Sequence, residues 1–118
     1  MEKIYSLNAY GEDHKIILGK TTYANNNTLA VLMIEVCDDG HEENFAVLTV
    51  NLAESGFMCD ASSLAFIDIN NLRYLNIKDW CVDNNICTFP GITTCSGFVK
   101  DYPLALFTDE AVAGMRKL

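Results

Sequence analysis

The sequence predicts one α+β domain over residues 1–118, built mainly on an antiparallel sheet of four to six strands with one or two short helices. Segment 29–36 is apolar on both faces except at Glu35, as in a central strand that is covered on both sides. Segment 44–52 alternates between apolar and polar residues, as a half-buried antiparallel neighbour does. The chain has 118 residues, of which 50% are hydrophobic, and this suffices for a core of its own.

The first half of the chain predicts strands joined by turns. Segments 3–7 and 14–18 are two short strands separated by a turn-rich stretch. The asparagine triplet 25–27 comes next, and asparagine tolerates the left-handed backbone region better than most residues do. We therefore interpret the triplet as the reversal that leads into strand 29–36, rather than as a ligand-binding cluster. Segment 38–40, Asp-Asp-Gly, supplies the next turn.

The second half predicts helices among further strands. Segment 64–69 is a strand, and 76–84 is a short helix with apolar residues at i, i+3 and i+4. Segment 97–107 includes one more strand. A final helix begins at its cap, Thr108, with two acids in the first turn and the basic pair 116–117 in the last, which complements the helix dipole.

The sequence predicts no membrane-spanning segment and no secretory signal. The longest apolar run, 29–34, is far shorter than the ~18 residues that span a bilayer. The N-terminal residues lack a basic stretch followed by an apolar one and a cleavage site. We therefore expect a cytoplasmic protein.

The cysteines predict neither a disulfide nor a metal centre. Their number, five, is odd, and a reducing cytosol keeps thiols free. Cys81, Cys87 and Cys95 lack the close spacing of a zinc knuckle. Cys37 and His41 are spaced like half of a metal site, but no further ligands are evident in the sequence. We expect no cofactor, no metal, and no zinc or disulfide requirement for folding.

The charge is acidic and uneven. The formal net charge is −8, and residues 1–59 carry nine of the sixteen acids against three lysines. Residues 60–118 carry seven acids against five bases. Without a basic patch, direct binding of nucleic acid is disfavoured, because phosphate contacts supply most of such affinity. A protein partner with a basic, nucleic-acid-binding surface fits this charge, as does plain solubility.

The sequence does not predict an enzyme. His14 and His41 are the only histidines, and neither adjoins a recognisable nucleophile motif. No glycine-rich loop of the kinds that hold phosphates is present. The residue chemistry favours a binding protein or a passive module.

A run of acids is the predicted partner-binding site. Five acids fall within nine residues at a hairpin tip, without the spacing of a calcium-binding loop. A purely solvated tip is the alternative. Tyr10, Tyr23, Phe57 and Tyr102 lie in expected loops and are candidate aromatic anchors beside it. The predicted partner-binding residues are Glu35, Asp38, Asp39, Glu42 and Glu43.

Four blocks of sequence carry a resemblance to a family. They are TYANNNTLAVLMI, FAVLTVNL, AFIDINN and SGFVKDYPLALF. Together they resemble an uncharacterised family of small proteins encoded on conjugative elements and prophages of gut Firmicutes, over roughly residues 2–107. The resemblance implies no catalytic residues.

The resemblance implies a genomic setting in which small acidic proteins often counter host defences, as anti-CRISPR proteins do. The expected function is therefore binding and inhibition of a host defence nuclease, most of all a CRISPR–Cas effector. Two alternatives stay open. One is an accessory protein of conjugation or plasmid maintenance, and the other is a module that binds a small molecule or a metal.

Overall fold

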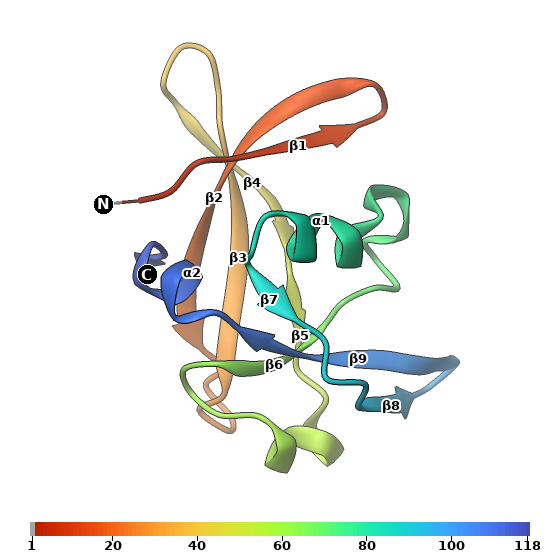
Figure 1. Ribbon diagram of the computed structural model, residues 1–118. Helices are drawn as coiled ribbons and strands as arrows, with labels where there is room; N and C mark the ends of the chain where they lie inside the picture. The colour runs from red at the N-terminus through yellow and green to blue at the C-terminus, as the bar shows by residue number, and fades with distance from the viewer. Residues whose placement is uncertain (1) are drawn as a thin grey trace.

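The computed structural model describes residues 2–118, in which ten strands form two sheets of five (Figure 1). The strands of the first sheet are β1 (Tyr5–Ala9), β2 (Glu12–Thr22), β3 (Leu29–Val36), β4 (Glu42–Val47) and β10 (Arg116–Lys117). The strands of the second are β5 (Thr49–Val50), β6 (Leu64–Ile67), β7 (Cys87–Thr88), β8 (Thr93–Ser96) and β9 (Val99–Phe107). The helices are α1 (Ile77–Asp83) and α2 (Asp109–Ala113), with 3₁₀ turns η1 (Ala53–Met58) and η2 (Arg73–Leu75).

The predicted fold class, α+β with mainly antiparallel sheet, is confirmed. The first sheet has the order β1-β2-β3-β4, and β10 lies beside β2 in parallel. The second has the order β5-β6-β9-β7, with β8 also paired to β9. β3 occupies the predicted segment and lies between two partners, as a two-sided apolar strand requires.

The prediction of a single strand over 44–52 is wrong, because the chain passes from one sheet to the other at Leu48. The backbone N–H of Leu48 donates to the Val31 carbonyl (2.9 Å), while its own carbonyl accepts from Asp68 N–H (3.0 Å). Leu48 and Thr49 are both buried, although neighbours on one strand point to opposite faces. Both sides are covered here because the two sheets meet at this point.

The β1–β2 hairpin is tighter than the sequence predicts. Its loop has only two residues, Tyr10 and Gly11, with φ of 53° and 80°. Positive φ at both positions is typical of the type I′ turn, whose twist matches that of the flanking strands. The strands therefore extend into the stretch that the sequence predicts to be a loop, and the hairpin projects at the same end of the sheet as the loop between β3 and β4 (Figure 1).

One hydrophobic core joins the two sheets and the helices. It includes the predicted face of α1, formed by Ile77, Trp80 and Cys81. The indole N–H of Trp80 donates to the carbonyl of Ser6 (2.8 Å), which ties α1 to β1. A smaller core lies around Phe66 in the second sheet. Within residues 2–118, none of the helices is long and apolar enough to cross a membrane.

The C-terminal segment differs in part from its prediction. The Thr108 hydroxyl accepts from Ala111 N–H (3.0 Å) and caps α2 as expected. The helix ends at Ala113, however, and the basic pair 116–117 forms β10 rather than a last helical turn. Lys20 of β2 instead donates its ammonium group to the Val112 carbonyl (3.1 Å), and so brings positive charge to the carbonyl end of α2.

Candidate functional site

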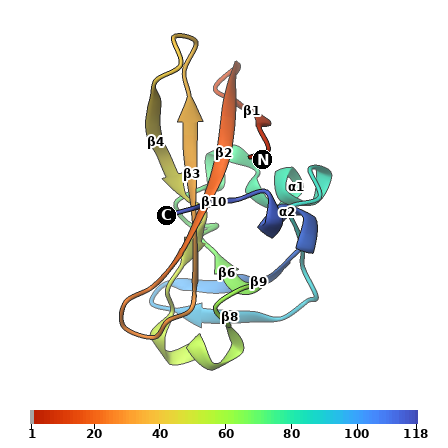
Figure 2. The same cartoon turned by 90° about the vertical axis from the view of Figure 1, so that its left-hand side faces the viewer.

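Two hairpins project from the same end of the molecule (Figure 1, Figure 2). One joins β1 to β2, and the other joins β3 to β4 through the predicted turn 38–40. A groove of about 580 Å³ is lined by residues of both hairpins. We call this part of the molecule the acidic end and define it by seven carboxylates: Glu12, Asp13, Glu35, Asp38, Asp39, Glu42 and Glu43.

Strand alternation divides the acids of the β3–β4 hairpin between two faces. Glu35 lies opposite Glu43 in the strand register, and Val36 lies opposite Glu42. Because side chains on a strand alternate, Glu35 and Glu43 share one face and Glu42 lies on the other. Cys37, two residues beyond Glu35, belongs to the first face.

On the first face, Glu35 is paired with a histidine of the neighbouring strand. Glu35 Oε2 lies 2.5 Å from His14 Nδ1, and both side chains are largely buried. The His14 ring also packs against Phe45, with ring centroids 5.3 Å apart. Glu35 and His14 both line the groove, so this pair forms part of its wall. The Glu35 carboxylate is therefore already paired with His14 within the chain.

On the other face, Arg116 joins both ends of the chain to the hairpin. Its guanidinium donates to both Glu42 carboxylate oxygens (2.6 and 2.7 Å). It also donates to both oxygens of Glu2 (2.6 and 3.0 Å). These hydrogen bonds lower the pKa of Glu2 and Glu42 and raise the pKa of Arg116. The network ties the start of β4, next to the turn, to β10.

At the hairpin tip, His41 lies between two carboxylates. Its Nδ1 contacts Asp39, and its Nε2 lies 2.9 Å from Glu43 Oε1. Hydrogen bonds with Glu43 and Asp39 raise the pKa of His41, while bonds from His41 lower the pKa of Asp39. All three side chains are exposed.

Cys37 adjoins this exposed cluster. Desolvation raises the pKa of its thiol, and the carboxylates of Glu43 and Glu35 raise it further. The Cys37 sulfur, an imidazole nitrogen of His41 and a carboxylate oxygen of Glu43 lie within 4.8 Å of one another. Thiolate, imidazole and carboxylate are all zinc ligands. The tip therefore gathers three metal-ligating side chains.

Three acids of the acidic end are exposed and make few contacts within the chain. Glu12, Asp13 and Asp38 are exposed and line the groove. Asp13 accepts a hydrogen bond from the Asn8 amide (3.1 Å). Among residues 2–118, Glu12 and Asp38 form no ion pair. These carboxylates are accessible to a partner.

The structure thus brings the five predicted residues to one hairpin but gives them different surroundings. Sequence reasoning found the run of acids and missed the partners that lie on other strands, chiefly His14 and Arg116. It also left Glu12 and Asp13 out of the site. The sequence carried one signal that Cys37 and His41 lie close together. A turn at 38–40 places residues 37 and 41 beside each other on opposite sides of the hairpin.

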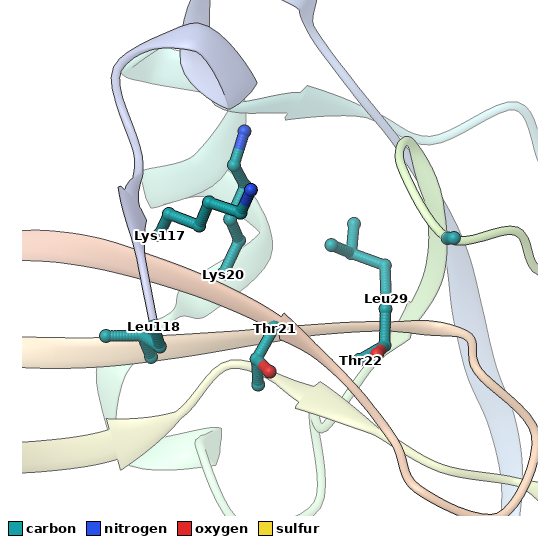
Figure 3. A pocket seen from close by; sticks show the side chains of 7 residues that line it. Lys20, Thr21, Thr22, Leu29, Lys117 and Leu118 are labelled. Atoms are coloured by element: carbon teal, nitrogen blue, oxygen red, sulfur yellow. The ribbon is translucent and has the colours of Figure 1, made fainter.

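A second hollow lies where β2 meets β10. Its volume is about 330 Å³, and the side chains of Lys20 and Lys117 extend to the same side of it (Figure 3). The ammonium group of Lys20 is already bound to the Val112 carbonyl. This hollow therefore lacks the converging donors of a built anion site.

A family model matches residues 17–117, and its description is Domain of unknown function (DUF4313). This match covers more than half of the chain. No curated protein and no solved structure matches the chain.

Proposed function

The chain belongs to the DUF4313 family, described as a domain of unknown function, and we propose that it is a non-enzymatic inhibitor of a host defence nuclease. In this proposal the partner is a CRISPR–Cas effector, and the protein acts in the cytoplasm for the mobile genetic element that encodes it. The acidic end occupies the partner's basic, nucleic-acid-binding surface. The gathering of seven carboxylates on two adjoining hairpins is the observation that carries the proposal.

Charge complementarity supports this choice of partner surface. A nuclease that holds a guide–target duplex does so in a positively charged channel. A narrow, negatively charged projection accelerates association with such a channel and competes with nucleic acid for it. The two hairpins project beyond the body of the molecule, so their tips reach into a concave surface more readily than a flat sheet does.

The predicted partner-binding residues take two roles in this proposal. Asp38, Asp39 and Glu43 are exposed and contact the partner. Glu35 and Glu42 hold the hairpin in place through His14 and Arg116. Positioning of this kind reduces the entropy that is lost when the hairpin binds.

Tyr10 is the aromatic anchor that best fits the acidic end. It lies at the turn of the β1–β2 hairpin, is 86% exposed, and stacks on Tyr74 with ring centroids 5.3 Å apart. Stacking holds the ring in one orientation, which lowers the cost of ordering it in an interface. Of the other candidate anchors, Tyr102 is buried and Phe57 lies in η1, outside this end.

The test measures binding to purified Cas effectors and inhibition of their DNA cleavage. The acidic-end variant carries Glu12→Gln, Asp13→Asn and Asp38→Asn. We expect slower association, a weaker dependence of affinity on salt, and reduced inhibition, because these carboxylates are exposed at the tips.

A matched control changes the net charge by the same amount elsewhere. It carries Glu54→Gln, Asp83→Asn and Asp101→Asn, three exposed acids outside the acidic end. The control should associate and inhibit like the wild type. Equal losses in both variants would remove the acidic end as the binding surface. Wild-type protein that neither binds nor slows any effector would end the proposal of nuclease inhibition.

A further inference from the structure

The tip of the β3–β4 hairpin holds two side chains, Cys37 and His41, that the proposed inhibition does not use. Cys37 directly follows β3, and His41 follows the turn. Backbone bonds fix their spacing, since Cys37 N–H donates to the His41 carbonyl and Gly40 N–H donates to the Cys37 carbonyl (both 2.9 Å). Gly40 takes φ of 90°, which keeps the turn tight.

Glu43 completes a three-sided arrangement. It lies two residues after His41 and therefore on the same face of the hairpin. One ligand atom from each of Cys37, His41 and Glu43 lies within 4.8 Å of the other two. Zinc–ligand bonds are about 2.0–2.3 Å long, so the ligand atoms of a tetrahedral site stand roughly 3.3–3.8 Å apart. Small side-chain rotations therefore suffice to place all three around one ion.

We propose that Cys37, His41 and Glu43 form a binding site for one zinc ion, with the fourth position open to water. The donor set suits zinc because this borderline-soft ion takes thiolate, imidazole and carboxylate together. Calcium and magnesium, in contrast, select sites built from oxygen alone.

Asp39 supplies the support that a metal-bound histidine ordinarily has. Its carboxylate contacts His41 Nδ1 and also accepts from His41 backbone N–H (3.0 Å). An imidazole that donates through Nδ1 presents the lone pair of Nε2, and this nitrogen faces Glu43 at 2.9 Å. Asp39 therefore orients the histidine without occupying a ligand position.

The surrounding charge also favours a dication. Asp38 lies in the turn itself, and Glu35 lies opposite Glu43 in the register. Neither takes a ligand position in the proposed site, and both add negative potential beside it. The site lies on the exposed tip, apart from both hydrophobic cores, so folding does not depend on the ion. The proposal therefore departs from the expectation of no metal and keeps the expectation that folding requires no zinc.

Cobalt(II) titration of the reduced, full-length protein tests the site, because a cobalt–thiolate bond gives a charge-transfer absorption that oxygen and nitrogen ligands do not. We expect one cobalt ion per chain, intense visible bands typical of four-coordination, and loss of both features on addition of one equivalent of zinc. Cys37→Ser and His41→Ala should each weaken binding at least tenfold. Asp39→Asn should weaken it about 10- to 100-fold, as loss of outer-shell partners does, while keeping the thiolate band.

Cys95→Ser is the matched control, because Cys95 is an exposed thiol that lies outside the site. It should bind cobalt like the wild type. Circular dichroism and thermal unfolding without metal should be nearly unchanged in every variant, since the altered side chains lie at the tip or, for Cys95, at an exposed position in β8. A thiolate band that persists in Cys37→Ser, its absence from the wild type, or full affinity in Glu43→Gln would each overturn the proposal. Nuclease inhibition is not measured here, so either proposal can fail without the other.

Discussion

Replacement of Thr49 by valine should destabilise the protein more than replacement by serine. Thr49 is 2% exposed and lies just after the point where the chain leaves the first sheet. Its hydroxyl oxygen accepts from the Val31 backbone N–H (3.1 Å) and hydrogen-bonds the Tyr23 hydroxyl (2.9 Å). The side chain thus replaces the strand partner that β3 loses where β4 ends.

The magnitude follows from what each variant removes. Valine keeps the shape but leaves the Val31 N–H, at a fully buried residue, without an acceptor, which costs about 1–3 kcal/mol. Loss of the half-buried Tyr23 bond adds roughly 0.5 kcal/mol. We therefore expect Thr49→Val to lower the free energy of unfolding by about 2–3 kcal/mol. Thr49→Ser keeps both bonds and loses one buried methyl group, at a cost of about 1 kcal/mol.

Guanidinium unfolding and amide exchange measure these effects. Each kcal/mol corresponds to a fall in Tm of roughly 3–5 °C for a domain of this size. The Val31 amide should exchange faster in Thr49→Val than in Thr49→Ser. The Tyr23→Phe variant measures the loss of the hydrogen bond between Tyr23 and Thr49 alone. A Thr49→Ser variant as unstable as Thr49→Val would refute the reasoning, because packing rather than hydrogen bonding would then set the cost.

Three further predictions concern single side chains. Trp80→Phe should lower the free energy of unfolding by about 1–3 kcal/mol, measured by denaturant unfolding, because the Ser6 carbonyl loses its donor. Cys95 should react first with a thiol reagent in the native protein, and the two buried cysteines should react only on unfolding; equal rates would contradict their burial. The pKa of His41, followed by NMR with chelator present, should lie above its ordinary 6.5 and fall in Glu43→Gln. The contribution of protonated His41 to stability is complete below pH 6.5 and is lost as the pH rises through its raised pKa. An unshifted titration would exclude the pairing of His41 with Glu43 and Asp39.

Local signals determined much of this fold from sequence alone. The two-sided apolar pattern located β3, and the turn chemistry of 25–27 and 38–40 located the reversals on either side of it. The hydroxyl of Thr108 capped α2 as predicted. These features depend on interactions within a few residues, and such interactions can be read from composition and spacing.

Tertiary structure decided the features that depend on distant pairing. The division of the predicted strand 44–52 into β4 and β5 could not be read from the sequence, because the break at Leu48 exists only where the two sheets meet. The sequence predicts Arg116 in the last turn of a helix. In the structure its carboxylate partners are Glu2 and Glu42, 114 and 74 residues away along the chain. Strand register and the parallel placement of β10 bring these groups together, and no local pattern encodes either. The acidic run was therefore predictable, whereas the pairing of its members depended on the assembled sheet.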